Sequence, residues 1–468
     1  NHKIQFLALA IASLLGACAT QTYVPQPITP AQSEAGIRAR SLDSVELRDY
    51  MLAQGYPQAS LPVTAWGLHE LTLAAFFYHP QLDLARARLR EAQAAMVVAG
   101  AKANPGVAAG VEHHSRSEGG ISPWTLGFSF DIPIETGGKR AIRIEQASHL
   151  SEAARIEIGQ TAWQVRRDLR DRLLDDHVAN EQITVLQTET NIRGEIVQML
   201  ETRYAAGLIS STELGSARLQ LQSAQQQLQA AQGRSAELRA QLAAAAGLPA
   251  PALATAKLDP ALLHALPAWE QLPAEANQRA ALLNRLDLRA ALARYAAAES
   301  ALQLEIAKQR PNITLSPGYS FDQGDNRWSL GLSLILALLN KNEGPIAAAS
   351  ARRDTEAASF DVLQASIIAE QEQALAKYRA ALDEIAAAER ALQSLRQQQA
   401  LTARQFEAGY SDRLELAGVR LETVSAERHL LSRRVKAQQA LGMLEDALQQ
   451  PLDETLLPDL PGMKEPHA

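Results

Sequence analysis

Two long stretches without proline constrain this chain more than any other feature of its sequence. It has 468 residues and 21 prolines, yet residues 134–248 and 346–450 contain none. Proline inside a helix removes a hydrogen bond and clashes with the preceding turn, so proline-free segments of this length are typical of long helices. A helix from about Lys139 to Ala206 would extend roughly 100 Å at 1.5 Å per residue. Such a rod must pair along its length or line a space.

The two halves of the chain repeat each other. "WTLGFSFDIPI" from Trp124 aligns with "WSLGLSLILAL" from Trp328, and "RYAAGLISSTELGSARL" aligns without a gap with "QFEAGYSDRLELAGVRL". Upstream, "LDLARARLREAQ" and "LDLRAALARYAA" begin matching helices at Leu82 and Leu286. Self-similarity at this scale indicates a duplicated structural unit. Each half is predicted to form a helix, a hairpin, a very long helix, a turn and a helix.

The helix after the first turn carries the packing pattern of a coiled coil. Small or apolar residues keep a strict spacing of three and four. They are Leu214, Ala217, Leu221, Ala224, Leu228, Ala231, Ser235, Leu238 and Leu242. Alternation of leucine with alanine permits close helix approach, and only 5% of the chain is aromatic. The pattern therefore predicts long, closely packed helices rather than one thick core.

Each long helix is predicted to end in a tight turn. Gly207 and Gly409 stand where a residue in the left-handed conformation would end a helix. Ser210 with Glu213, and Asp412 with Glu415, have the spacing of a capping box that starts the next helix. We therefore expect the same tight helical hairpin in both halves.

Two eleven-residue segments alternate between large apolar and small or polar residues. The apolar positions are Trp124, Leu126, Phe128 and Phe130 in the first copy and Trp328, Leu330, Leu332 and Leu334 in the second. Length and period match a tilted transmembrane β-strand with these residues toward lipid, and a soluble hairpin packed on helices is the alternative. Each segment has a plausible partner strand across a polar loop. Because four strands cannot close a barrel and lipid does not tolerate an open sheet edge, several chains would have to pool their strands. Three chains would give twelve strands around a polar lumen.

The N-terminus has the pattern of a secretory signal. The apolar run "IQFLALAIASLLGA" is too short to span a bilayer as a helix but has the length of a signal core. Cys18 follows it directly and is the only cysteine in the chain. The motif "LGAC" resembles a bacterial lipobox, which implies cleavage before Cys18 and lipid attachment to it, and Ala19 favours sorting to the outer membrane. A buried structural thiol is the alternative.

The chain is thus expected to contain six segments. These are a signal peptide (1–17), a lipid-anchored extension (18–65), a first repeat (66–248, strands about 106–114 and 123–134), a linker (249–275), a second repeat (276–450, strands about 312–321 and 327–338) and a tail (451–468).

Several other functions find no support in the sequence. The net charge of -7, without a basic block, argues against a nucleic-acid partner. The "GGKR" ending at Arg140 lacks the first glycine, the spacing and the hydroxyl residue of a phosphate-binding loop. His113 and His114 would point to opposite faces of a strand, with no third metal ligand near them. We therefore predict no enzyme, no cofactor and no metal site.

The chain from roughly Trp66 to Gln450 resembles the TolC-like outer-membrane efflux protein family in its duplicated elements, strand motifs and paired turns. "LTLAAFFYHPQLDLARA", "PIETGGKRAIRIEQA" and "LNKNEGPIAAASA" look most like the members that serve cobalt, zinc and cadmium type cation efflux. The resemblance implies a mainly α fold with a small β part: a homotrimeric α-helical barrel joined to a twelve-stranded barrel in outer-membrane lipid. It also implies a periplasmic adaptor and an inner-membrane resistance-nodulation-division type pump as partners, with this chain as a gated passive duct.

The resemblance further places both turns at the periplasmic tip. The residues concerned are Gly207, Glu213, Arg218, Gly409, Asp412, Glu415 and Arg420. Glu213 and Glu415 would help to attract cations there, and the alternative is that they only cap helices. Arg218 and Arg420 are expected to face solvent rather than pair with neighbouring helices.

Two rival functions stay open at this stage. One is an outer-membrane channel for drugs or other organic solutes, because selectivity can lie largely in the pump. The other is a structural coiled-coil lipoprotein of the periplasm without a pore. The alternating strands distinguish the second rival from a channel, since a purely helical rod has no need of them.

Overall fold

The computed structural model describes residues 21–116 and 119–452 and divides the chain into two units. The first, Asn1–Ser41, contains α2 (Pro30–Arg38). The second, Leu42–Ala468, begins with α3 (Val45–Ala53), the 3-10 turn Gln58–Ser60 and α4 (Leu68–Tyr78). Among the described residues, no helix combines the length and the apolar character needed to cross a membrane.

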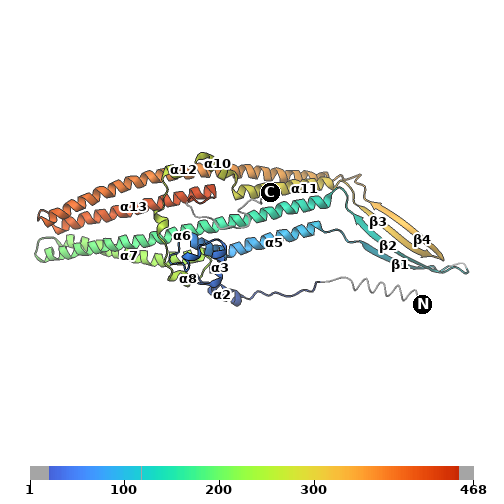
Figure 1. Ribbon diagram of the computed structural model, residues 1–468, viewed down its shortest axis with the longest axis horizontal. Coiled ribbons are helices and arrows are strands. Elements are labelled where there is room, and N and C mark those ends of the chain that lie inside the picture. The colour runs from blue at the N-terminus through green and yellow to red at the C-terminus, as the bar shows by residue number, and fades with distance from the viewer. Residues whose placement is uncertain (1–20, 117–118, 453–468) are drawn as a thin grey trace. The chain divides into compact units, whose positions relative to one another are not determined.

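The second unit contains one set of elements twice. The first set is α5 (Pro80–Gly100), β1 (Gly106–His113), β2 (Trp124–Ile134), α6 (Lys139–Ala205) and α7 (Ser211–Ala245). The second set is α11 (Leu286–Ala307), β3 (Ile313–Asp322), β4 (Asp325–Leu334), α12 (Glu343–Glu407) and α13 (Arg413–Leu448). Figure 1 shows α6 beside α7, α12 beside α13, and the four strands together beyond the far ends of the long helices. The predicted fold class, mainly α with a small β part built from a duplicated unit, is confirmed.

The heptad pattern of α7 forms its contact with α6. Leu214, Ala224, Leu238 and Leu242 are buried, and the other five positions of the pattern are half-buried. Most residues between them are exposed. The predicted seam is therefore the packing face of this helix.

The four strands form one antiparallel sheet in the order β1-β2-β3-β4. β2 pairs with β3 along its length, from Thr125 opposite Asp322 to Ile134 opposite Ile313, and this pairing joins the two repeats. β1 and β4 are edge strands, each paired with one neighbour. The sheet of a single chain is therefore open on both sides.

The last strand is shorter than its sequence pattern predicts. The alternation continues to Leu338, but β4 ends at Leu334, which lies opposite Ile313, the first residue of β3. β2, in contrast, extends to Ile134, the residue that corresponds to Leu338 in the first repeat. Ile134 has a partner, because it pairs with Ile313 on the other side of β3. The expected end at 338 is thus wrong for the single chain, since residues beyond Leu334 have no strand to pair with.

The two strand-to-helix joints use the same backbone conformation. Gly138 (φ 72°) and Asn342 (φ 63°) occupy equivalent positions and are the left-handed N-caps of α6 and α12. In the first joint the Lys139 ammonium donates to the Arg310 carbonyl (2.5 Å) and to Asn312 Oδ1 (2.6 Å). The "GGKR" motif therefore turns the chain from β2 into α6 and fixes that turn against the second repeat.

The connection between the repeats holds the long helices together at mid-length. It contains α8 (Ala250–Ala254), α9 (Ala261–His264), a 3-10 turn (Trp269–Gln271) and α10 (Glu275–Leu283). The Tyr378 hydroxyl of α12 donates to the Pro267 carbonyl (2.6 Å), and the Gln438 amide of α13 donates to two carbonyls around α9. The largest apolar core lies where α3, α4 and α8 pack on α6 and the end of α7.

A buried arginine fixes the contact between α6 and α13. The Arg170 guanidinium passes over Gly442, donates to the Gln438 carbonyl and lies 3.6 Å from Glu445. A Cβ at residue 442 would overlap this guanidinium. Gly418, in the same helix, has open space where a Cβ would stand.

We predict that Gly442→Ala destabilises the protein by about 1–3 kcal/mol, because the arginine must move away from its buried partners. Gly418→Ala, the matched control, should stabilise it by about 0.5–1 kcal/mol, since alanine has the better helix propensity. Thermal denaturation of both variants tests this. Equal effects of the two substitutions would contradict the proposed packing of Arg170.

Candidate functional site

The open sheet has one apolar and one polar face. The predicted lipid-facing residues share the apolar face and are all exposed in the single chain. Their exposed fractions are 48, 48, 44 and 43% for Trp124, Leu126, Phe128 and Phe130, and 81, 73, 64 and 41% for Trp328, Leu330, Leu332 and Leu334. An apolar surface of this kind requires a cover that the single chain does not provide.

Aromatic rings form a row across this apolar face. Phe128 lies opposite Tyr319, which lies opposite Trp328, with ring centroids 5.6 and 4.9 Å apart. At the end of the hairpin His113 contacts the Trp124 ring edge-on at 4.6 Å. Sequence reasoning missed Tyr319 because its strand, "ITLSPGYSFD", alternates less clearly than β2 and β4.

The polar face collects the acidic residues of the sheet. Glu112, Asp131, Asp322 and Asp325 all lie on it, as the strand register requires. Arg327 is the one basic residue among the four strands that bears a permanent charge, and it pairs with Asp322 at 2.6 Å. Asp322 also accepts a hydrogen bond from Thr125 (2.7 Å), and Asp131 accepts one from Ser316 (2.6 Å). The net negative charge of this face therefore favours cations over anions.

Adjacent residues on the two faces allow a direct test of the lipid assignment. We predict that Leu332→Arg prevents stable membrane assembly, because an arginine facing the middle of a bilayer costs about 2–4 kcal/mol in each chain. Ser333→Arg, on the polar face, should still assemble. The yield of folded protein in extracted membranes measures both effects, and normal assembly of the Leu332 variant would contradict a lipid-facing sheet.

The two tight turns have the predicted backbone. Gly207 (φ 72°) and Gly409 (φ 78°) adopt the left-handed conformation at the ends of α6 and α12. Ser210 Oγ accepts from the Glu213 amide (3.2 Å), and Asp412 Oδ1 accepts from the Glu415 amide (2.7 Å). Each turn thus ends one helix and caps the next. The Glu213 and Glu415 side chains are exposed beside them, and Ser411 donates to Glu415 at 2.7 Å.

An ion pair brings the two turns together. Arg203, at the end of α6, lies 2.8 Å from Asp412 in the other repeat. The hydrogen bond from this guanidinium, together with that from the Glu415 amide, lowers the pKa of Asp412 below its ordinary value. The hairpin ends of both repeats therefore meet in one chain, which the sequence comparison of the repeats did not reveal.

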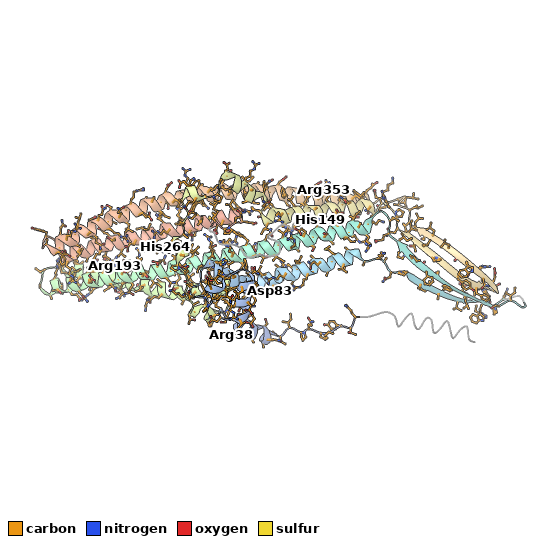
Figure 2. All side chains as sticks on the ribbon, viewed as in Figure 1. Arg38, Asp83, His149, Arg193, His264 and Arg353 are labelled. Atoms are coloured by element: carbon orange, nitrogen blue, oxygen red, sulfur yellow. The ribbon has the colours of Figure 1, made fainter. Side chains whose placement is uncertain are left out.

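Arg218 and Arg420 are partly exposed, but the expectation that they do not pair with neighbouring helices is wrong. Arg218 pairs with Glu201 of α6 (2.6 Å), and Arg420 of α13 pairs with Glu195 of α6 (2.9 Å). Further from the turn along α6, Arg193, which Figure 2 labels, donates to Gln220 of α7 at 2.9 Å. Near the turns, α6 thus contacts both α7 and α13. The glutamate partners of the two arginines were not predicted, because they lie on another helix, 17 and 225 residues away in sequence.

A second charged cluster, buried, joins α6 to α13 near mid-length. Arg166 lies 3.0 Å from Glu445, and both side chains are about 95% or more buried. Trp163 donates its indole N–H to Asp446 (3.0 Å). Burial raises the pKa of Asp446 to about 6, although Arg167 and Arg170 lower it. Because the folded-state pKa lies above the ordinary value of 3.8, the carboxyl stabilises the fold when protonated and less as the pH rises through about 6.

We predict that Asp446→Asn raises the thermal stability at pH 7.5 by about 1–3 kcal/mol, because the amide keeps the bond from Trp163 without a buried charge. The gain should shrink as the pH falls from 6.5 to 4.5. Melting curves across this range test the prediction, with Asp168→Asn, an exposed carboxylate of α6, as the control. A gain that does not change with pH would contradict it.

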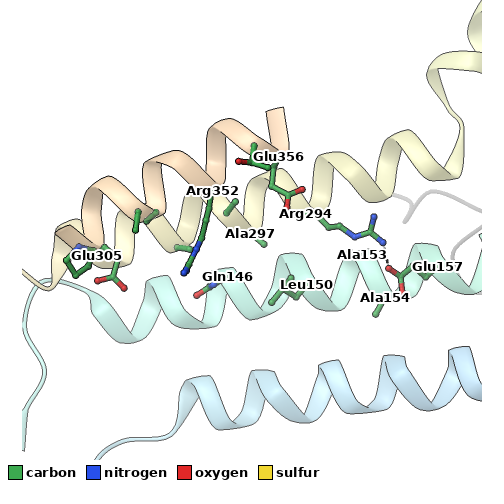
Figure 3. A pocket seen from close by; sticks show the side chains of 16 residues that line it. Gln146, Leu150, Ala153, Ala154, Glu157, Arg294, Ala297, Glu305, Arg352 and Glu356 are labelled. Atoms are coloured by element: carbon green, nitrogen blue, oxygen red, sulfur yellow. Dashed lines mark hydrogen bonds and ion pairs between the residues drawn. The ribbon is translucent and has the colours of Figure 1, made fainter. Parts of the chain in front are cut away.

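A groove of about 670 Å³ lies between α6, α11 and α12. Figure 3 shows its charged side chains, with Glu157 of α6 paired to Arg294 of α11, and Glu305, Arg352 and Glu356 along the other side. Alanines form most of its floor. Both charge signs alternate along it, and no cysteine, serine or histidine is among its lining residues.

The histidines near the sheet bind their own neighbours. His114 Nε2 lies 2.9 Å from Thr125 Oγ1, and His113 packs on Trp124. Within residues 21–116 and 119–452, no group of three or more His, Cys, Asp or Glu side chains could hold a metal ion. Cys18, the predicted lipidation site, lies outside the described residues.

Comparison with known proteins now adds to this geometry. The model of the "Outer membrane efflux protein" family matches residues 77–248 and 278–449, which are the two repeats and more than half of the chain. The chain belongs to this family. Its family and fold are those of channels.

Two relatives of known name match with sequence identities below 30%. The cobalt-zinc-cadmium resistance protein CzcC of Cupriavidus metallidurans is 28% identical over 229 residues, which cover 48% of this chain and 53% of CzcC. The chain thus matches about half the length of that relative. The pyoverdine export outer membrane protein OpmQ of Pseudomonas aeruginosa is 25% identical over 82% of this chain and 79% of its own length.

The fold also agrees with that of a solved outer membrane protein. VceC of Vibrio cholerae matches with a TM-score of 0.67 at 22% identity, over 82% of this chain and 97% of that one. At this identity the match supports the arrangement of helices and strands and carries no information on substrate.

Proposed function

We propose that this protein is the outer-membrane channel of a tripartite efflux system. Three copies form a twelve-stranded barrel in the membrane and an α-helical barrel below it, and the chain is anchored by lipid at Cys18. The tight turns receive substrate from a periplasmic adaptor, and an inner-membrane pump of the resistance-nodulation-division type supplies the energy. The protein itself conducts passively, and heavy-metal cations are the substrate class that we favour.

The observation that carries this proposal is the open sheet. Its two edge strands and its exposed apolar face would be unstable in water and in lipid, because unpaired backbone groups and uncovered apolar surface are both costly. Further copies of the same sheet pair the edges, and lipid covers the face. The acidic face then lines the lumen.

The unequal burial of the two long helices supports the same assembly. α6 has 21 buried residues of 67, whereas its repeat equivalent α12 has 8 of 65. α6 packs on helices of both repeats, while α12 packs mainly on α11 and α13 of its own repeat. Apolar side chains of α12 such as Val362 (70% exposed) and Leu401 (58% exposed) stay uncovered. α12 thus has room for the helices that a neighbouring copy would supply.

Two observations support a cation as substrate. The sheet's carboxylates all lie on the face that would line the lumen. The name of CzcC assigns cobalt, zinc and cadmium resistance to that relative. Export of an organic solute is the second candidate, and it is supported by the longer match to OpmQ, whose name assigns pyoverdine export.

Conductance in planar lipid bilayers tests the channel and its charge preference together. We expect single-channel steps with cations more permeant than anions. Glu112→Gln should reduce that preference because it removes a carboxylate from the polar face, whereas His113→Gln, on the opposite face, should not. Absence of conductance from correctly assembled protein would overturn the channel proposal.

Deletion of the gene separates the two substrate candidates. If metal cations are the substrate, the deletion strain becomes more sensitive to cobalt, zinc or cadmium and keeps its tolerance of dyes and detergents. The reverse pattern would favour an organic solute and leave the channel proposal intact.

A further inference from the structure

Basic residues concentrate at the four joints between the strands and the helices (Figure 1). The joints are residues 100–105, 135–143, 305–312 and 335–343, and together they contain seven basic and three acidic residues. The strands, in contrast, contain Arg327 and four carboxylates. Every joint has a lysine, and two of these are equivalent in the repeats, because Lys102 and Lys308 each precede a joint proline by three residues. The joints are therefore positive next to a sheet that is negative.

Several of these bases are available to a partner from outside the chain. Lys102, Arg310 and Lys341 are exposed, and in the part of the chain that the structure describes none of them has a carboxylate within ion-pair distance. Arg140 is exposed as well, and its hydrogen bond goes to a backbone oxygen, the Gly100 carbonyl, at 2.6 Å. The chain itself thus leaves these charges uncompensated.

A cleft of about 850 Å³ brings bases of two joints next to aliphatic side chains. The bases are Lys139, Arg143, Lys308 and Arg310, and the aliphatic residues include Leu334, Leu336 and Leu339. One acidic residue, Glu135, lines the cleft, and it pairs with Arg143 at 2.6 Å. The cleft therefore has a net positive charge and suits an anionic group that is attached to a hydrocarbon chain.

The first repeat holds Arg310 in place at this cleft. The Arg310 carbonyl accepts from the Lys139 ammonium at 2.5 Å. The side chain of Arg310 lies against Gly137, where a Cβ would stand 3.1 Å from Arg310 Cδ. The glycine thus leaves room for the stem of the arginine, whose guanidinium stays exposed.

The bases lie just beyond the end of the strands. Arg310 precedes the first residue of β3 by three residues, and Lys102 precedes that of β1 by four. The headgroup layer of a bilayer is about 5–7 Å thick on each side, so long basic side chains at this level reach the phosphate groups. The hairpin ends lack the positive excess, since Glu112, Asp322 and Asp325 lie there with Arg327.

We propose that the joints bind the phosphate groups of anionic phospholipids in the leaflet nearest the long helices. Lys308 and Arg310 donate charge-assisted hydrogen bonds to the phosphate oxygens at the cleft, and the leucines of the cleft cover the start of an acyl chain. Lys102 and Lys341 add to the attraction from the neighbouring joints. The inference rests on the proposed membrane insertion and adds the class of lipid that the protein selects.

Native mass spectrometry of the assembled protein tests this selection. The protein is titrated in detergent with phosphatidylglycerol and with phosphatidylethanolamine of the same acyl chains. We expect phosphatidylglycerol to bind about tenfold more tightly, because the unpaired bases favour a lipid with a net negative charge. The combined change Lys308→Gln and Arg310→Gln should remove most of this preference.

Two further variants serve as controls. Arg116→Gln with Arg327→Gln removes the same charge at the hairpin ends and should leave the preference unchanged. Lys308→Arg with Arg310→Lys keeps the charge of the cleft and should also keep the preference. A loss of preference in the first control would mean that net charge alone selects the lipid, and it would overturn the proposed site.

The unmodified protein decides the inference even if a variant does not assemble. Equal affinity for the two lipids would overturn it, and so would competition by glycerol phosphate at the concentration of the lipid, since the site would then take free phosphate. In both cases the channel proposal stands if the protein conducts. Protein that neither enters bilayers nor conducts would overturn both.

Discussion

The backbone of an open sheet is the constraint on which the rest of this structure depends. A four-stranded antiparallel sheet with an apolar face has two rows of unpaired N–H and C=O groups, and only closure removes both. In the proposed assembly one kind of contact serves twice. The second strand of one repeat pairs with the first strand of the next, both within a chain and between chains. The long helices continue the same arrangement, so α12 is left as open along its length as β4 is at its edge.

Besides the pairing of β2 with β3 and the packing of α6 on α11 and α13, ion pairs far from the sheet connect the two repeats. Arg166 and Arg170 of α6 converge on Glu445 of α13 in a buried cluster, and Arg203 and Arg420 connect the same pair of repeats near the turns. A buried pair contributes less to net stability than its contacts suggest, but removal of one partner leaves an uncompensated charge. These bridges therefore specify which helix faces meet more than they raise stability. They leave the two turns joined by an exposed pair of modest strength.

Much of this fold could be predicted from the sequence because its patterns are local. The proline-free stretches, the heptad seam from Leu214, the turn glycines and the caps at Ser210 and Asp412 each depend on neighbours within a few residues. The partners of Arg218 and Arg420 could not be predicted, because they depend on how helices distant in sequence rotate against each other. Tyr319 was missed for a related reason, since its role comes from cross-strand neighbours. The early end of β4 is different: the pattern to Leu338 is present, and what is missing is the strand to pair with it.

The joint within a chain and the corresponding joint between copies in the proposed assembly are equivalent in position but differ in chemistry. Inside the chain, Lys139 donates to Arg310 and Asn312, and Thr136 donates to the Pro311 carbonyl. At the equivalent positions the second joint has Glu343 for Lys139, and Gly106 takes the place of Asn312. The ammonium bonds cannot be repeated there, so the contact between copies in the proposed assembly would depend on backbone pairing instead. In the proposed assembly, polar side chains therefore fix the joint within each chain, whereas the joint between copies lacks the lysine bonds.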